Sequence, residues 1–433
     1  MNSATPKVLH RIAGRTMLGH VLDAVRGAGA TRVAVVIGPG SHDSAAEVNA
    51  VFPGAGVYIQ AERLGTAHAV LAAREEMAGD ADDVVIAYAD TPLVSPSTFE
   101  RLRAPLGEGA AVAVLGFEAA DPTGYGRLIR EGERLTSIRE ERDASPAERA
   151  ITLSNAGLMA LRGDVALGLL EAVGNANAKG EYYLTDVVAL ASERGETAAV
   201  VTVAEDEVQG VNDRVQLAAA ERVFQDRLRR AAMAGGATLI APETIFLSAD
   251  TRLGRDVIVE PHVWFGPGVE IGDRVTIRAF SHLEGARVAS DAIIGPFARL
   301  RPGARLGEGV HIGNFVEVKN AELGPGVKAN HLAYLGDASV GAGSNIGAGT
   351  ITCNYDGVAK HRTTIGRDVF IGTDSSLVAP VSVGDGAYIG TGSVITADVP
   401  PGALALGRAR QVVKEGWAAA RKAGSAQGTK TGS

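Results

Sequence analysis

An aliphatic residue or phenylalanine returns at every sixth position over much of the stretch from residue 253 to residue 395. Many of these residues are followed by glycine, as at Ile312-Gly313 and Ile371-Gly372. This period is typical of a parallel β-helix, in which each six-residue unit is a short strand and a turn. The repeated side chain points inward, and stacked coils bury it. The predicted inward-facing residues are Leu253, Val259, Phe265, Ile271, Ile277, Leu283, Ile294, Leu300, Leu306, Ile312, Val318, Ile365, Ile371, Leu377, Val383, Ile389 and Ile395.

The composition agrees with a repeat that has tight corners. Of 433 residues, 46% are hydrophobic but only 5% are aromatic, and 55 are glycine, which favours a β-helix over the alternatives of a glycine-rich loop or a β-sandwich. The net charge of −8 gives no indication of nucleic-acid binding. The single cysteine, Cys353, excludes an intrachain disulfide and favours a reducing compartment. There is no apolar signal segment and no run of about 18 apolar residues, so we expect a soluble cytoplasmic protein without a membrane partner.

Residues 1–211 have the pattern of an α/β domain. Short apolar runs predict buried parallel strands at residues 32–37, 83–88, 110–115 and 198–203, and helical patterns lie between them at residues 16–28 and 66–77. The alternation predicts a mostly parallel, Rossmann-like sheet with ligands beyond the carboxyl ends of its strands. Asp90 follows one such strand end, where it could hold Mg²⁺ or merely cap a helix.

The remaining chain divides into three parts. Residues 212–235 predict a linker helix, residues 236–417 the β-helix, and residues 418–433 a disordered tail. One polar insertion, residues 353–364, interrupts the six-residue phase and predicts a loop on the binding face. His331 and Tyr334 precede this insertion at a second break in the phase, which makes them better functional candidates than residues on regular faces.

Short motifs occur in both halves of the chain. The first half contains Pro6-Lys7-Val8-Leu9, Gln60, Leu64-Gly65-Thr66, Tyr88-Ala89-Asp90 and residues 121–127, 180–183 and 210–212. The second half contains residues 299–303, 313–317, 330–332, 345–350 and 353–357. Together they resemble the bacterial bifunctional N-acetylglucosamine-1-phosphate uridyltransferases / glucosamine-1-phosphate N-acetyltransferases, from residue 1 to about residue 417. The resemblance implies an α/β nucleotidyltransferase domain followed by a left-handed parallel β-helix.

For the second half, the resemblance implies acetyl transfer from acetyl-CoA to glucosamine 1-phosphate. His331 would be the general base, and histidine is the side chain whose ordinary pKa suits that task. By resemblance, Arg301 and Lys319 would hold the sugar phosphate, and Tyr334 and Asn345 the sugar. Residues that match the acetyl-CoA site are Ala348, Asn354, Tyr355, Thr373, Thr391 and Arg408. From the residues alone, a loop histidine and a solvated charged face remain the alternatives.

For the first half, the resemblance implies uridylyl transfer from UTP to N-acetylglucosamine 1-phosphate, which yields pyrophosphate and UDP-N-acetylglucosamine for cell-wall precursors. Asp90 and Asn212 would hold Mg²⁺, and Lys7 would neutralise phosphate charge. The residues expected to read uracil are Gln60, Gly65 and Thr66, and those expected along the sugar nucleotide are Tyr88, Ala89, Gly126, Glu140 and Asn155. Ala89 departs from the family, which has glycine there. The resemblance also implies a homotrimer assembled through the β-helix.

The start of the sequence is a larger departure. The family opens with a strand and a glycine-rich loop ending in Gly-Thr-Arg-Met, and Met1 stands at the place of that last methionine. We expect that a start codon assigned too far downstream explains this. The alternative is a chain in which only the acetyltransferase is active.

Three other readings stay open at this point. A monofunctional sugar-1-phosphate nucleotidyltransferase with a β-helical appendage would not need the polar cluster around His331. A scaffolding solenoid would need no polar residues at the phase breaks. A γ-carbonic-anhydrase-like β-helix would use histidines on the coil, but their spacing does not fit; they are His262, His282, His311, His331 and His361.

Overall fold

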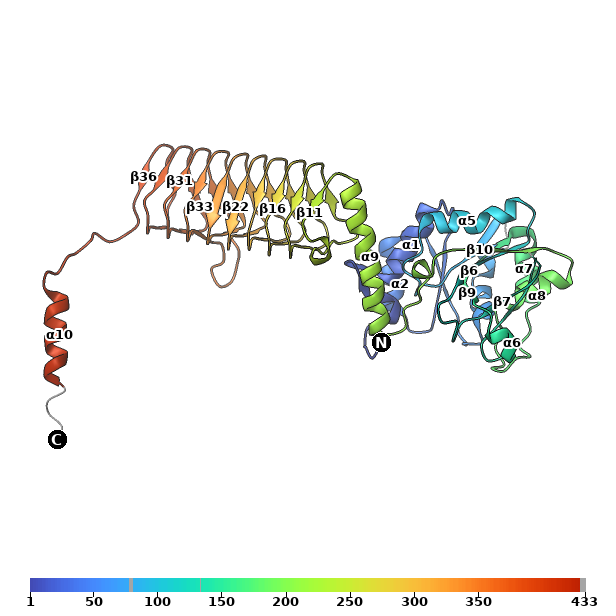
Figure 1. The fold of residues 1–433 in the computed structure, drawn as a ribbon. Helices are drawn as coiled ribbons and strands as arrows, with labels where there is room; N and C mark the ends of the chain where they lie inside the picture. Colours follow the sequence, from blue (N-terminus) through green and yellow to red (C-terminus); the bar gives the residue numbers. More distant parts are fainter. Residues whose placement is uncertain (78–80, 133, 429–433) are drawn as a thin grey trace, which may run out of the picture. The chain divides into compact units, whose positions relative to one another are not determined.

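The computed structural model describes residues 1–77, 81–132 and 134–428, and it divides into two compact units. The first, called here the N-terminal unit, comprises Met1–Ala231 and Phe246–Ala249. The second, called here the β-helix unit, comprises Ala232–Ile245 and the chain from Asp250 onward. Figure 1 follows the chain through both units.

The β-helix unit is a stack of triangular coils, visible as parallel rungs in Figure 1. Each coil contributes one strand to each of three parallel sheets, called sides 1, 2 and 3 in chain order. Side 1 has ten strands: β11 (Thr238–Leu239), β13 (Ile258–Val259), β16 (Thr276–Ile277), β19 (Ile293–Ile294), β22 (His311–Asn314), β25 (Lys328–His331), β28 (Asn345–Ile346), β31 (Phe370–Ile371), β34 (Tyr388–Ile389) and β36 (Leu404–Ala405).

The other two sides have eight strands each. Side 2 consists of β14 (Trp264–Phe265), β17 (His282–Leu283), β20 (Arg299–Leu300), β23 (Glu317–Lys319), β26 (Tyr334–Gly336), β29 (Ile351–Cys353), β32 (Ser376–Val378) and β35 (Val394–Ile395). Side 3 consists of β12 (Arg252–Leu253), β15 (Glu270–Ile271), β18 (Arg287–Val288), β21 (Arg305–Leu306), β24 (Glu322–Leu323), β27 (Ala338–Val340), β30 (Thr363–Ile365) and β33 (Val381–Val383). A short 3-10 helix, η3 (Pro242–Thr244), lies near the start of the unit.

The predicted inward-facing residues form the core of this unit. All of them are buried except Leu253, which is half-buried. Successive coils stack in register, so that Ile277 pairs with Ile294 and Ile294 with Ile312. Burying one such side chain stabilises the fold by about 1.5–3 kcal/mol. The left-handed parallel β-helix predicted from the sequence is confirmed.

The corner between sides 1 and 2 turns through residues with positive φ. Successive coils place His262, Phe280, Phe297 and Phe315 there, with φ between 56° and 61°. Their rings stack from coil to coil, with centroids 5.0 Å apart for Phe280 and Phe297 and 5.3 Å apart for Phe297 and Phe315. We call these four residues the aromatic column. Its phenylalanines are between 45% and 56% exposed, so an apolar stripe lies open along this corner.

The polar insertion forms a loop that projects from the coils between β29 and β30 (Figure 1). An antiparallel bridge between Tyr355 and Lys360 closes it. Inside the loop, Asp356 accepts hydrogen bonds from the backbone N–H groups of Val358 and Ala359, at 2.8 and 2.7 Å. These bonds and the His361 imidazole hold the pKa of Asp356 far below its usual range. The insertion is therefore an ordered loop, organised by one carboxylate.

The main sheet of the N-terminal unit has six strands. Its order is β10 (Ala198–Thr202), β6 (Val112–Glu118), β9 (Leu153–Arg162), β7 (Arg127–Glu131) and β8 (Arg134–Arg139), and β5 (Asp83–Ile86) also pairs with β9. A separate parallel pair is formed by β3 (Ala34–Ile37) and β4 (Gly56–Ile59), and a short antiparallel pair by β1 (Arg11–Ile12) and β2 (Arg15–Thr16).

This sheet corrects the prediction of mostly parallel strands. The β10–β6 pair is parallel, but β9 pairs antiparallel with both β5 and β6, and β7 pairs antiparallel with β8 and β9. A strand buried on both faces has the same apolar pattern in either direction, so its sequence does not reveal the direction.

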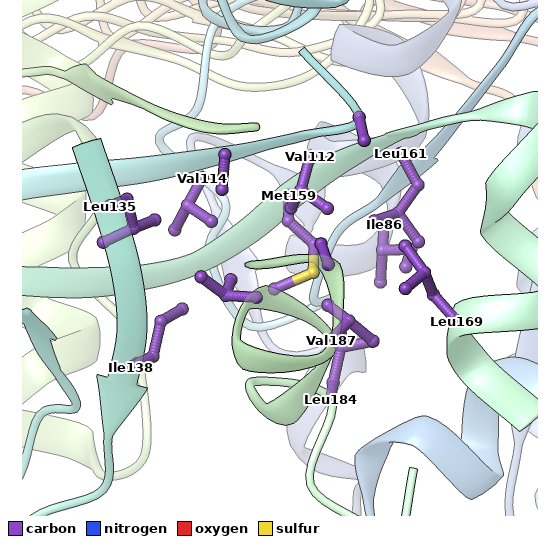
Figure 2. Packing of buried hydrophobic residues seen from close by; sticks show 14 of the residues in the cluster. Ile86, Val112, Val114, Leu135, Ile138, Met159, Leu161, Leu169, Leu184 and Val187 are labelled. Carbon is purple, nitrogen blue, oxygen red and sulfur yellow. The ribbon is translucent and has the colours of Figure 1, made fainter. Parts of the chain in front are cut away.

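The core of the N-terminal unit lies on both faces of this sheet. Alternate residues of β6 point to opposite faces, Val112 and Val114 to one and Ala113 and Leu115 to the other. Helices α7 (Gly163–Glu171) and α8 (Asp186–Glu193) cover the first face. Figure 2 shows Met159 of β9 there, packed toward Val187 of α8. Helix α5 (Pro96–Gly107) covers the second face through Phe99, Leu102 and Leu106.

The remaining helices test the other predicted elements. They are η1 (Lys7–Leu9), α1 (Met17–Gly27), α2 (His42–Val51), α3 (Thr66–Leu71), α4 (Arg74–Met77), α6 (Pro146–Arg149), η2 (Glu205–Glu207), α9 (Arg214–Ala234) and α10 (Trp417–Gly428). The helix expected over residues 66–77 is divided into α3 and α4. Helix α9 belongs to the N-terminal unit as far as Ala231, so it is more than a linker.

The structure describes the tail in part. Residues 417–428 form α10, the disordered tail over residues 418–433 stays a prediction from the sequence, and residues 429–433 lie outside the described part of the chain. Alanine-rich composition explains the helix, since alanine has the highest helix propensity. Within the described ranges, no helix combines the length and the apolar character needed to cross a bilayer.

Candidate active sites

One edge of the β-helix collects several of the predicted residues. In each coil, the second residue after the buried residue of side 1 stands at the corner toward side 2. The register pairs Asn314 directly with His331, and it continues from Ala329 to Ile346, Ile371 and Ile389. The corner residues therefore lie above one another, and we call this set the edge column: Pro296, Asn314, His331, Ala348, Thr373 and Thr391.

The edge column places the candidate base in line with part of the predicted acetyl-CoA site. Ala348, Thr373 and Thr391 follow His331 on successive coils. Backbone hydrogen bonds join these corners, from Asp374 N–H to the Ala348 carbonyl at 2.7 Å and from Gly392 N–H to the Thr373 carbonyl at 2.8 Å. Arg408 lies beside Gly392, so it extends the same edge by one coil. The arrangement is a straight, exposed edge suited to an elongated ligand.

His331 is exposed and has one hydrogen bond from its ring. Its Nδ1 lies 3.0 Å from Oδ1 of Asn314 on the preceding coil. Within the described ranges, no hydrogen bond engages Nε2. The ring therefore has one nitrogen fixed by the protein and one free for a substrate.

Sides 1 and 2 carry the predicted sugar-binding residues next to this edge, Asn345 on side 1 and Tyr334 on side 2. Tyr334 pairs with Glu317 of the preceding coil, and Glu317 Oε1 accepts a hydrogen bond of 2.8 Å from Arg301 Nη1. This bond is the main reason that the pKa of Arg301 is raised. Asn345 lies on side 1, one coil beyond Lys328. Side 2 thus separates the His331 corner from the Arg301 corner by one short strand.

The corner after side 2 gathers positive charge. The Lys360 ammonium, brought by the insertion loop, lies beside Lys319 and is the largest cause that lowers the pKa of Lys319. Arg301 lowers it further. Three cations held close together repel one another, so this corner favours an anion such as a phosphate. Lys360 was not among the residues predicted for this role.

The insertion loop is anchored at its base and open at its tip. The buried Asn354 donates from Nδ2 to Asp337, which also accepts a 2.5 Å hydrogen bond from Asn320. Tyr355 is 60% exposed, and its hydroxyl donates to the Gly357 carbonyl at 2.6 Å. Of the two predicted acetyl-CoA residues in this loop, Asn354 is held by the protein and Tyr355 faces outward.

In the N-terminal unit, Lys7 joins the two predicted metal ligands. Its Nζ lies 2.6 Å from Asp90 Oδ2 and 2.9 Å from Asn212 Oδ1. Asp90 follows β5, and its carbonyl accepts a 2.9 Å hydrogen bond from Val211, the neighbour of Asn212. Helix η1 positions Lys7. The fold thus brings together residues that are 83 and 205 positions apart.

The Asp90 carboxylate oxygen and the Asn212 amide oxygen are suited to form part of the coordination shell of Mg²⁺. A carboxylate and an amide oxygen converge on one cation, the Lys7 ammonium. Mg²⁺ commonly takes only one or two protein oxygens and completes its shell with water and substrate phosphates. In the described ranges no group of three or more histidine, cysteine, aspartate or glutamate side chains could hold a metal ion. The metal would therefore depend on the nucleotide for its remaining ligands.

The predicted uracil-reading residues lie together at the start of α3. Gln60 Nε2 donates to the Gly65 carbonyl at 3.0 Å. Gly65 has φ of 124°, and a side chain there would overlap the backbone of Tyr182. Thr66 Oγ1 accepts a 2.9 Å hydrogen bond from the backbone of Leu184. Glycine is thus required at this position both by the conformation and by the close approach of the Tyr182 backbone.

A buried tyrosine connects this region to the predicted sugar contacts. Burial raises the pKa of Tyr88 to about 12, while a hydrogen bond with Thr66 acts in the opposite direction. The Tyr88 ring lies against Gly157, whose N–H donates to Asn155 Oδ1 at 3.0 Å. Asn155 in turn donates its backbone N–H to the Gly126 carbonyl at 2.8 Å. Ala89 lies between Tyr88 and Asp90 in the chain.

Glu140 completes this cluster. Burial raises its pKa, and Thr185 Oγ1 donates to its Oε1 at 3.1 Å. Glu140 also lies within reach of Gly126, since a Cβ built on that glycine would be 3.7 Å from Glu140 Oε1. Hydrogen bonds from sugar hydroxyls would offset the free-energy cost of burying this carboxylate.

Sequence reasoning missed several residues of these sites. Arg127 is 2% exposed, and its guanidinium reaches Glu141 at 2.7 Å and the carbonyls of Tyr125 and Arg149. It stood in the motif at residues 121–127, but nothing in the motif reveals its burial. Asn314 and Glu317 also stood in a motif, and the register of the coils would have identified both as neighbours of His331 and Arg301.

Comparisons with known proteins agree with both halves. Residues 1–153 match the family model of the MobA-like NTP transferase domain, and residues 285–320 and 362–397 match that of the bacterial transferase hexapeptide (six repeats). A protein of Azorhizobium caulinodans, named bifunctional protein GlmU, is 67% identical over 98% of this chain and 94% of its own length. Relatives of the same name from Xanthobacter autotrophicus and Agrobacterium fabrum are 65% and 54% identical, over 98% and 97% of this chain and 94% and 93% of their own lengths.

These relatives cover 97–98% of this chain and therefore extend over both units. A monofunctional nucleotidyltransferase, a scaffolding solenoid or a carbonic anhydrase would not account for such identity along the whole chain. The chain belongs to the GlmU family of bifunctional proteins.

Proposed function

We propose that this chain makes UDP-N-acetylglucosamine by acetyl transfer in the β-helix unit followed by uridylyl transfer in the N-terminal unit. Membership of the GlmU family supports the two activities. His331 on the β-helix edge supports the location of acetyl transfer, and the separate cluster of Lys7, Asp90 and Asn212 supports that of uridylyl transfer. The substrates are glucosamine 1-phosphate, acetyl-CoA and UTP. The cytoplasmic location stays a prediction from the sequence.

In acetyl transfer, the ammonium group of the amino sugar must first lose a proton. His331 takes it, and the free amine attacks the thioester carbonyl of acetyl-CoA. The new C–N bond forms and the C–S bond breaks, the second amine proton passes to the departing thiolate so that coenzyme A leaves as a thiol, and His331 returns the first proton to solvent. Arg301, Lys319 and Lys360 hold the sugar phosphate by charge, while Tyr334 and Asn345 orient the sugar.

The acetyl-CoA contacts follow the edge of the β-helix. Thr373 and Thr391 lie on the coils after His331, and Arg408 supplies a cation for a phosphate of coenzyme A. Tyr355 at the exposed loop tip and Asn354 at its base complete the set with Ala348. A thioester lying along this edge brings its carbonyl to the His331 coil.

In uridylyl transfer, an oxygen of the sugar phosphate attacks the α-phosphorus of UTP, and the bond to pyrophosphate breaks. Asp90 and Asn212 would hold Mg²⁺, and the chemistry that the ion would supply there is neutralisation of phosphate charge. Lys7 exchanges its contact with Asp90 for a phosphate oxygen. Gln60, Gly65 and Thr66 contact uracil, and Glu140, Asn155, Gly126, Ala89 and Tyr88 line the sugar side.

The β-helix unit also presents a surface for a second copy of the chain. The aromatic column leaves three phenylalanines about half exposed directly beside the edge column. Apolar stripes of this kind mark interaction sites. We therefore propose a homotrimer in which this corner packs against a neighbouring subunit, so that the acetyl transfer site lies between subunits.

Two assays on the purified chain test the proposed function. Acetyl-CoA and glucosamine 1-phosphate should release free thiol, and UTP with N-acetylglucosamine 1-phosphate and Mg²⁺ should release pyrophosphate. If glucosamine 1-phosphate replaces N-acetylglucosamine 1-phosphate in the uridylyl transfer assay, it should react poorly. That result would show that acetyl transfer precedes uridylyl transfer. A chain that releases neither product contradicts the proposal.

A further inference from the structure

Two strands of side 1 continue further into the corner than their predecessors. Strands β22 and β25 have four residues each, whereas β13, β16 and β19 have two. The extension pairs Asn314 with His331 across neighbouring coils, and the Leu332 N–H donates to the Asn314 carbonyl at 3.0 Å. Phe315 and Leu332 then turn the chain with φ of 57° and 48°. The backbone therefore fixes both residues side by side at equivalent positions.

Their side chains meet in a contact with a defined direction. Asn314 Oδ1 lies 3.0 Å from His331 Nδ1. An amide oxygen accepts but does not donate, so the contact requires a hydrogen on Nδ1 and leaves the lone pair of a neutral imidazole on Nε2. We propose that Asn314 is a positioning residue for acetyl transfer, which holds His331 in the tautomer and orientation that make Nε2 the base. This rests on the acetyl transfer proposed above.

The other residues of the edge column could not do this. Pro296 and Ala348, on the coils next to this pair, have no side-chain acceptor. Past the corner, Glu317 is engaged by Arg301 at 2.8 Å and Arg299 at 3.5 Å. The remaining titratable groups nearby are His311 and Lys328 on side 1 and Tyr334 on side 2, and none hydrogen-bonds to the His331 ring in the described ranges.

A neutral acceptor suits this step better than a charged one. A carboxylate in place of Asn314 would stabilise the imidazolium and delay its deprotonation until higher pH. An apolar residue would leave the ring free to rotate and to adopt the other tautomer, in which Nε2 carries a hydrogen and is no base. In both cases the amine proton is transferred less often at neutral pH, although the substrates still bind.

The test compares Asn314→Ala and Asn314→Asp with the parent chain and with Thr276→Ala, a matched change at an outward position of side 1. For Asn314→Ala we expect kcat of acetyl transfer to fall about tenfold or more, with KM for glucosamine 1-phosphate within about twofold. For Asn314→Asp we expect the acid limb of the kcat profile to move up by about one pH unit, with activity recovering at alkaline pH. Thr276→Ala should match the parent, and all variants should keep uridylyl transfer, which reports folding.

Either of two results overturns the inference: an Asn314→Ala chain with the parent kcat, or an Asn314→Asp chain with an unshifted acid limb. Failure of the underlying proposal looks different, because then the parent chain itself releases no thiol or His331→Ala stays active. A rise in KM alone would assign Asn314 to substrate binding and would also overturn the positioning role.

Discussion

The two units build their sites over very different distances along the chain. In the β-helix unit, the contacts join residues on successive coils: Asn314 and His331 are 17 positions apart, Arg301 and Glu317 are 16 apart, and Asn354 and Asp337 are 17 apart. In the N-terminal unit, Lys7 meets Asp90 and Asn212 across 83 and 205 positions. The first site follows from a repeat, and the second requires the whole domain to fold.

This difference bears on how each site tolerates change. A repeat unit contacts mainly its neighbours, so a perturbation should remain within a few coils. The Lys7 cluster depends on three segments that are far apart in the chain and meet only when the domain folds. Substitutions should therefore separate the two activities cleanly, and the following experiments measure how cleanly.

The largest effect should come from His331→Ala. Acetyl transfer should fall by about 10²–10⁴-fold because the ammonium no longer has a base, while uridylyl transfer stays at the parent rate. Thiol release and pyrophosphate release from the same preparation measure both. His311→Ala, on the preceding coil of side 1, is the matched control. Near-normal acetyl transfer in the His331 variant would refute the base assignment.

The reciprocal experiment is Asp90→Asn. Removing this charge weakens the hold on both Lys7 and Mg²⁺, so uridylyl transfer should fall about 10²-fold or more and need a higher Mg²⁺ concentration. Acetyl transfer should not change. Asp83→Asn on β5, which breaks a surface ion pair with Arg103, serves as control. Equal losses in the Asp83 and Asp90 variants would point to a general effect on the sheet.

A charge in the aromatic column tests the trimer. Phe297→Lys places an ammonium in the middle of the stacked rings, where a subunit interface would have to desolvate it. We expect sedimentation to show monomers and acetyl transfer to fall about tenfold, with uridylyl transfer unaffected. Ser339→Lys, on side 3, should leave the assembly intact. A Phe297→Lys chain that remains trimeric would exclude this corner from the interface, and a fully active monomer would show that the acetyl transfer site does not lie between subunits.

The smallest expected effect concerns pH and Glu140. Burial raises the pKa of Glu140 in the folded chain, so the stability linked to it is fully present below the ordinary glutamate pKa and is lost as pH rises through the folded pKa. In Glu140→Gln the side chain does not ionise, so this loss of stability with rising pH does not occur. Relative to the parent, its N-terminal unit should gain roughly 2 °C in Tm between about pH 4 and pH 7, measured by calorimetry.

Glu148→Gln provides a control of opposite sign. The capping box with Ser145 lowers the pKa of Glu148, so its stabilising effect is present at neutral pH and disappears as pH falls. Relative to the parent, Tm of this variant should decrease as pH rises. If both glutamate variants change Tm in the same direction, the burial of Glu140 does not determine its contribution.

The sequence was informative in proportion to how local each contact is. The inward-facing residues were predictable because a six-residue period is visible without knowing the fold, and all but the half-buried Leu253 are buried. The register could also have identified Asn314, since it stands at the position of His331 one coil earlier. The antiparallel direction of β9 relative to β5 and β6 was not predictable, because a buried strand has the same pattern whichever way it runs.

The residues of the candidate sites also differ in how far the sequence alone indicated them. His331 was notable from its place at a phase break, whereas the grouping of Lys7, Asp90 and Asn212 came only from the resemblance to a family. Arg127 shows what neither source revealed. Its sequence context marks an arginine in a glycine-containing turn, and only the structure shows a guanidinium buried among Glu141 and two backbone carbonyls.

By itself, the sequence determined the β-helix, the position of its insertion loop and the residue types available for each reaction. The tertiary structure alone decided which of these meet: Lys360 beside Lys319, Asn314 beside His331, and Lys7 between Asp90 and Asn212. The physical reason is that apolar periodicity is written into neighbouring residues, while the meeting of polar side chains depends on chain paths that only packing and strand pairing fix.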